Sequence, residues 1–129
     1  MPSQKIRIIS PSIGEISAEL TEENPNTLTE FLKILPISAK ANLWGDEIYF
    51  KIPLKRVEAE HPRVAVKEGE IGIWIEDPSL CFFFGKTPVS QGEEIRAYSE
   101  VNVIGNIIGD PKILKKVKAN EAITVEALV

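Results

Sequence analysis

Apolar and polar residues alternate along most of the chain in short runs, which is the pattern of β-strands that bury one face. Turn residues, mainly glycine, proline, asparagine and aspartate, separate these runs. Residues 80–84 are apolar at every position and predict a central strand that is covered on both faces. About eight strands are predicted in all. Besides 80–84 they are expected at residues 5–9, 16–20, 37–43, 48–52, 71–75, 101–108 and 123–127, with a shorter run at 64–66.

One segment has the spacing of an amphipathic helix instead. Between Leu28 and Leu35, apolar residues recur at every third or fourth position, and Pro36 is expected to end the helix. Thr27 and Glu30 have the spacing of a capping box, in which each side chain hydrogen-bonds the backbone amide of the other residue. The pattern therefore predicts a helix that begins near Thr27 and packs one face on the core.

A second, shorter helix is predicted after Asp110 and Pro111, which suit the N-cap and the first helical position. Many short strands with only two helices favour a barrel or a sandwich over a parallel sheet covered by helices. No linker or low-complexity tract interrupts the chain, so residues 1–129 are expected to form a single mainly β domain. Closure into a barrel would leave no exposed strand edge.

Composition narrows the classes of function. The net charge is −4 and the lysines are scattered, so nucleic-acid binding is not expected. The longest apolar run, residues 80–84, is too short to span a bilayer, so no membrane association is expected. The first ten residues hold no apolar signal region, and the single cysteine excludes an internal disulfide, which together favour a cytoplasmic location. Glu and Lys dominate the charged residues, as in heat-adapted proteins.

Catalytic and metal-binding patterns are not found in the sequence. His61, the only histidine, lies in a polar loop, where we favour a surface role over a metal ligand or a general base. Cys81 lies in an apolar run, where we favour a buried thiol over a nucleophile. Nucleophile elbows, P-loops and dinucleotide fingerprints are absent. We therefore predict no catalytic residue, no metal site and no cofactor.

Aromatic residues give the most specific indication of a binding site. If Ile48 and Phe50 point into the core, Glu47 and Tyr49 point to the opposite face of the same strand. An aromatic surface with a few polar groups suits a small-molecule or peptide ligand, although a second core or a homodimer interface would use the same residues. The predicted ligand-binding set consists of Trp44, Glu47, Tyr49, Trp74, Phe82, Phe83, Phe84 and Arg96.

Four segments, taken in order, resemble a family of small prokaryotic cyclophilin-like proteins with no established activity. They are Ala41–Phe50, Gly69–Trp74, Cys81–Ser90 and Val101–Gly105. The predicted order of elements is also similar to that of cyclophilin, with two strands, a helix, a run of strands, a helix and a final strand. The resemblance implies a closed eight-stranded barrel with two capping helices.

The comparison with prolyl isomerases is informative about activity. Those enzymes place an arginine on the third strand and a phenylalanine and a glutamine on the fourth. The corresponding predicted strands, residues 37–43 and 47–52, contain neither arginine nor glutamine. A binding module for a small molecule or a peptide is therefore our main hypothesis. The alternatives are a prolyl isomerase with a non-standard site and a self-associating structural or partner-binding subunit.

Overall fold

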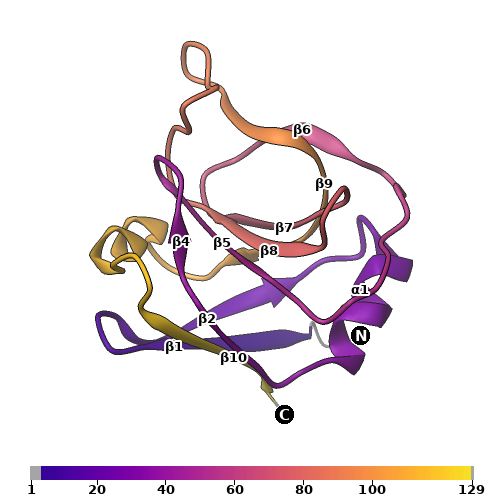
Figure 1. The fold of residues 1–129 in the computed structure, drawn as a ribbon, viewed down its shortest axis with the longest axis horizontal. Coiled ribbons are helices and arrows are strands. Elements are labelled where there is room, and N and C mark those ends of the chain that lie inside the picture. The colour runs from indigo at the N-terminus through magenta and orange to yellow at the C-terminus, as the bar shows by residue number, and fades with distance from the viewer. Residues whose placement is uncertain (1–3, 129) are drawn as a thin grey trace.

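The computed structural model describes residues 4–128, which form ten strands, one α-helix and one 3-10 helix (Figure 1). No helix within this range is long and apolar enough to cross a bilayer. The helices are α1 (Pro25–Lys33) and the 3-10 helix η1 (Pro111–Lys116). The strands are β1 (Lys5–Ser10), β2 (Gly14–Leu20), β3 (Ile37–Lys40), β4 (Asn42–Leu43), β5 (Glu47–Lys51), β6 (Arg63–Val66), β7 (Glu70–Trp74), β8 (Ser79–Phe83), β9 (Ile95–Ile107) and β10 (Ala122–Leu128).

All ten strands belong to one sheet, in the order β3-β10-β1-β2-β9-β7-β8-β5-β4, with β6 paired to β9 outside this path. The neighbouring strands are antiparallel, as expected for short strands joined by turns. The strand β9 is the longest, with 13 residues, and it pairs with β2, β6 and β7. Because it links these three strands, β9 connects the two halves of the sheet.

The predicted closed eight-stranded barrel with two capping helices is wrong. The sheet is open: its strand order ends at β3 on one side and at β4 on the other, and no ladder joins these edges within residues 4–128. β3 and β4 are consecutive segments of the chain, separated only by Ala41, and they pair with different strands, β10 and β5. The second predicted helix is a six-residue 3-10 helix and not an α-helical cap. Alternating residues report which face of a strand is buried, but they do not report which edges pair.

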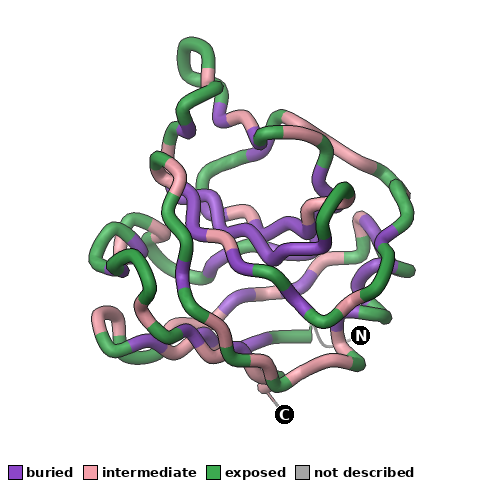
Figure 2. The backbone as a smooth tube through the Cα atoms, in the orientation of Figure 1, coloured by how far each residue is buried: buried purple, intermediate pink, exposed green. Residues whose placement is uncertain are grey.

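One face of the sheet encloses the main core. The side chains of Ile6, Ile8, Ile48 and Phe50 are at most 1% exposed, and they alternate with more exposed residues along β1 and β5. In Figure 2 the buried segments follow the central strands of the sheet. Phe31 of α1 is also fully buried against this core. Each fully buried side chain of this size stabilises the fold by roughly 1.5–3 kcal/mol before the loss of conformational entropy is included.

The start of α1 differs from the predicted capping box. Glu60, in the loop after β5, accepts hydrogen bonds from the backbone amides of Asn26 and Thr27, both at 3.0 Å. The hydroxyl of Thr27 contacts Glu60 at 3.1 Å and accepts a hydrogen bond from Asn102, while Glu30 pairs with a lysine on the helix surface. A carboxylate from a distant loop therefore satisfies the free amides of the first turn.

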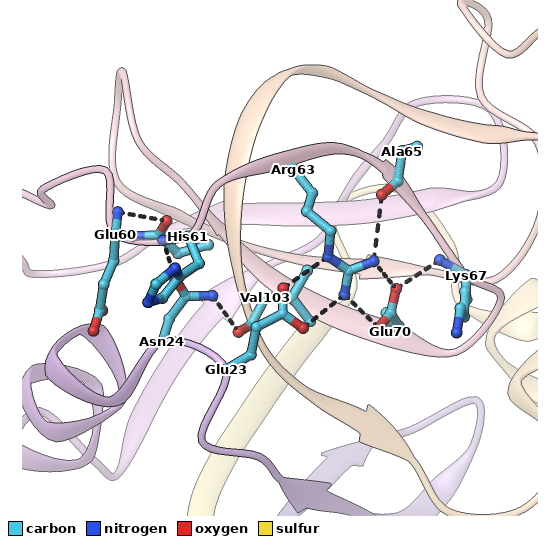
Figure 3. A network of polar contacts seen from close by, with 10 residues as sticks. Glu23, Asn24, Glu60, His61, Arg63, Ala65, Lys67, Glu70 and Val103 are labelled. Carbon is cyan, nitrogen blue, oxygen red and sulfur yellow. Dashed lines mark hydrogen bonds and ion pairs between the residues drawn. The ribbon is translucent and has the colours of Figure 1, made fainter.

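A polar network holds the segment that leads into β6 (Figure 3). The guanidinium of Arg63 contacts the carboxylates of Glu23 and Glu70, each at 2.7 Å. Next to this cluster, the side chain of Asn24 accepts a hydrogen bond from the backbone amide of His61 at 2.7 Å. These contacts fix β6 beside β9, on the side of the sheet that faces away from the main core.

Candidate functional site

A second, smaller apolar cluster lies on the sheet face that points away from the main core. Tyr49 on β5 is directly opposite Cys81 on β8, and Cys81 is opposite Gly72 on β7. Residues paired in this way project to the same side of an antiparallel sheet, so three strands contribute to one surface. The buried members of the cluster are Val66, Cys81, Phe83, Ile95, Ala97, Val101 and Val103, with Tyr49 and Trp74 packed against them.

A cavity of about 300 Å³ opens beside this cluster, which is at the lower end of the volumes that hold small molecules. Its lining combines four aromatic rings, one carboxyl group and one thiol. The residues are Trp44, Glu47, Tyr49, Trp74, Cys81 and Tyr98. They come from the turn before β5 and from β5, β7, β8 and β9, so residues distant in the sequence meet at one site.

The aromatic rings hold one another in place. The ring centroid of Tyr98 lies 6.0 Å from that of Trp44 and 6.0 Å from that of Trp74, with interplanar angles of 75° and 89°. Both contacts have the edge-to-face geometry that aromatic quadrupoles favour. The indole nitrogen of Trp74 donates a hydrogen bond to the hydroxyl of Ser99, which further fixes that ring. Tyr98 is 69% exposed and therefore forms the solvent-facing side of the cavity.

Glu47 is the polar group inside this aromatic lining. It is only 6% exposed, and burial raises the pKa of its carboxyl to about 7, although the nearby Cys81 thiol has a smaller lowering effect. The Cys81 thiol is the hydrogen-bonding partner of this carboxyl, Glu47 forms no ion pair among the described residues, and no Lys, Arg or His lines the cavity. Buried acidic groups are normally paired with a charged group or with several donors, so a buried carboxyl in a cavity with only a thiol beside it is unusual.

A tight turn presents Trp44 and Glu47 side by side. The amide of Trp44 donates to the carbonyl of Glu47 at 2.9 Å, and the amide of Glu47 donates back to the carbonyl of Trp44 at 3.2 Å. Gly45, within the turn, has a φ of +61°, and a Cβ there would approach the Cδ of Pro88 at 2.8 Å. Both the backbone conformation and the close approach therefore require glycine at this position.

Cys81 lies at the base of the cavity and is 2% exposed. Its thiol donates to the carbonyl of Ser79 at 3.7 Å. Burial and, to a smaller extent, the adjacent Glu47 raise the pKa of the thiol well above its usual value. The sulfur therefore stays protonated at neutral pH, which is the opposite of what a nucleophilic cysteine needs.

The structure brings half of the predicted ligand-binding set to one cavity. Of the eight residues, Trp44, Glu47, Tyr49 and Trp74 line it. Phe83 lies beneath them in the second apolar cluster. This face is thus partly a second core, as the alternative interpretation of the aromatic residues supposed, and partly an open cavity.

The other three predicted residues lie elsewhere. Phe82 and Phe84 belong to the main core, on the opposite side of β8 from Phe83. Arg96 lies on β9 outside the cavity lining, and its guanidinium pairs with Glu94 at 3.2 Å. A ligand-binding role for any member of the set remains a prediction.

Two lining residues were not in the predicted set, Tyr98 and Cys81. Tyr98 was missed because the strand was predicted to begin at residue 101, whereas β9 begins at Ile95. A signal was present, since Ile95 and Ala97 are apolar and alternate with Arg96 and Tyr98. Cys81 was assigned to the core, and its burial agrees with that assignment, but the cavity also reaches it.

Other candidate residues lie away from the cavity. His61 is exposed, and no group of three potential metal ligands occurs in the part of the chain that the structure describes. All four arginines form ion pairs with glutamates, and none lines the cavity. These pairs are Arg7 with Glu15 and Glu126, Arg56 with Glu58, Arg63 with Glu23 and Glu70, and Arg96 with Glu94.

Comparisons with known proteins agree with this architecture. A search of curated proteins finds no match. The solution structure of a hypothetical protein from Archaeoglobus fulgidus is similar, with a TM-score of 0.83 and 40% sequence identity over 96% of this chain and 94% of that chain. The model of the Cyclophilin-like family matches residues 4–126, which is nearly the whole chain and includes every residue of the cavity lining. On this evidence the chain belongs to the cyclophilin-like family.

Proposed function

We propose that this protein is a binding module whose ligand, a small molecule or a group of a peptide, occupies the aromatic cavity. The observation that supports this proposal is the buried carboxyl of Glu47, which lines the cavity with the Cys81 thiol as its partner and no cationic side chain in the lining. Leaving a buried polar group unpaired costs stability. Such costs are commonly retained at functional sites, where a ligand supplies the missing partner.

The aromatic rings provide the contact area that a ligand requires. Trp44, Tyr49 and Trp74 are half-buried, so each presents part of its surface to the cavity while the remainder is packed. Large rings with few rotatable bonds lose little conformational entropy on binding. In this arrangement the rings supply affinity, and the carboxyl of Glu47 orients the polar end of the ligand.

The alternatives derived from the sequence have less specific support. A prolyl isomerase needs a donor for the prolyl nitrogen, and no arginine lines the cavity. An assay with a proline-containing peptide tests that hypothesis directly. A self-associating subunit would use the exposed ring of Tyr98, and sedimentation tests whether the protein is a dimer. Both remain predictions.

A fragment screen followed by two-dimensional NMR tests the binding proposal. We expect hits that shift the amide resonances of Glu47, Cys81 and Tyr98 and change the fluorescence of the two tryptophans. Replacing Tyr98 by alanine should weaken those hits, because it removes the solvent-facing side of the cavity. Ile108→Ala is the matched control, since Ile108 is 45% exposed and lies just beyond the other end of β9. The proposal fails if no fragment shifts the lining residues, or if Tyr98→Ala binds the hits as tightly as the wild type.

A further inference from the structure

The cavity has the electrostatic character of a cation site. Its one carboxyl group is that of Glu47, and its lining contains no Lys, Arg or His. The other titratable groups that line it are Tyr49, Cys81 and Tyr98. None of these three can supply a positive charge. A positively charged ligand would therefore meet no repulsion and would find one carboxyl partner.

The aromatic rings also attract a positively charged ligand. The negative face of an indole or phenol ring attracts a cation within about 6 Å of the ring centroid, and tryptophan gives the strongest effect. Two tryptophans and two tyrosines surround this cavity. Trp44 and Trp74 both contact Tyr98 at 6.0 Å between centroids, so these three rings form one cluster in the cavity lining.

We infer that the cavity binds a small organic cation, with its ammonium group held between the aromatic rings and the carboxylate of Glu47. This inference rests on the proposed binding function and assigns the chemical class of the ligand. The cavity volume of about 300 Å³ is large enough for such an amine and, at the lower end of the range for ligand sites, leaves little room for a larger ligand.

The protonation of Glu47 gives the inference a measurable signature. Burial raises the pKa of this carboxyl to about 7, so the unliganded site is mostly protonated in mildly acidic solution. A bound cation favours the ionised form, and binding should therefore become tighter as the pH rises through this value. If only the ionised form binds, affinity at about pH 5.5 should be roughly 30-fold lower than at about pH 8.5.

A matched pair of ligands tests the inference. Choline carries a trimethylammonium group, and 3,3-dimethyl-1-butanol is its uncharged isostere with the same shape. Titration of the tryptophan fluorescence at about pH 8.5 should show choline binding at least about tenfold more tightly than the alcohol. Glu47→Gln should remove most of the preference for choline over the alcohol and all of the pH dependence of choline binding. The variant leaves the other titratable lining residues, Tyr49, Cys81 and Tyr98, unchanged. Glu93→Gln, which removes an exposed carboxylate, should retain both.

The outcomes separate this inference from the proposed function. Equal affinity for choline and the alcohol overturns the cation assignment but leaves the cavity as a binding site. The same holds if uncharged fragments bind in the cavity and choline does not. Failure of choline and of every fragment overturns both proposals. A short peptide containing trimethyllysine provides the last arm, and tighter binding of that peptide than of choline would overturn the assignment to a free small cation.

Discussion

Replacing Glu47 with glutamine should stabilise the protein at alkaline pH. Glutamine has nearly the same shape but carries no charge, so the variant removes the cost of ionising a buried carboxyl. Burial raises the pKa of Glu47 from 4.5 to about 7. Because a tenfold change in proton affinity corresponds to about 1.4 kcal/mol, the ionised carboxylate destabilises the folded state by about 3 kcal/mol relative to an ordinary glutamate.

The direction of the effect follows from the folded-state pKa, which is higher than the unfolded one. Below pH 4.5 the carboxyl is protonated in both states, and no stability is lost. As the pH rises from 4.5 to about 7, the unfolded chain releases its proton while the folded protein retains it, so the free energy of unfolding falls. Above this range both states are ionised and the loss is complete.

Urea denaturation of both proteins measures this loss. The difference in free energy of unfolding between Glu47→Gln and wild type should be larger at about pH 8 than at about pH 5 by about 2–3 kcal/mol. The other acidic groups contribute equally to the pH dependence of stability in both proteins, so their contributions cancel in this difference. Glu93→Gln should show no such difference, because Glu93 is exposed. The reasoning is refuted if Glu47→Gln is no more stable than wild type at about pH 5 and also no more stable at about pH 8. Ionisation of Glu47 would then not lower the free energy of unfolding.

Three further predictions concern other parts of the molecule. Phe82→Ala should lower the free energy of unfolding by about 3–5 kcal/mol in urea denaturation, because the ring is fully buried in the main core. Hydrogen bonds from Ser10 and Ser12 lower the pKa of Glu121 to about 2, so this glutamate stabilises the fold above pH 4.5 and the effect is lost as the pH falls towards 2. Glu121→Gln should therefore lower the melting temperature at neutral pH, and calorimetry should show the difference from wild type shrinking in acid. The thiol of Cys81 should react with a chromogenic disulfide reagent only as fast as the protein opens, whereas a fast reaction in native buffer would contradict its burial.

Features set by neighbouring residues were predictable from the sequence. The alternation of Glu47 and Tyr49 with Ile48 and Phe50 places two sets of side chains on opposite faces of β5, as the structure shows. This works because the side-chain period of a strand is a local property of the backbone. The same reasoning grouped four of the six lining residues before their strands could be placed next to one another.

Features set by contacts between distant residues were not predictable in this way. Glu60 caps α1 from a loop more than 30 residues away, so the local spacing of Thr27 and Glu30 suggested the wrong cap. The open edges of the sheet depend on which strands pair, and alternation carries no information about pairing. The alternation of Ile95 and Ala97 with Arg96 and Tyr98 indicates a strand, but no local pattern indicates that Tyr98 lies beside residues of β5, β7 and β8 in one cavity.

The two faces of the sheet have different roles, since one packs the main core and the other lines the cavity that we propose binds a ligand. On β5, Ile48 and Phe50 lie in the main core, and Glu47 and Tyr49 face the cavity from the same backbone. The core fixes this strand, so Glu47 and Tyr49 are positioned by a rigid element and not by a mobile loop. The core also offsets the free-energy cost of burying a carboxyl that has no charged partner in the cavity lining. Substitutions of the aromatic residues on the cavity face should therefore change ligand affinity more than stability, and substitutions such as Phe50→Ala on the core face should do the reverse.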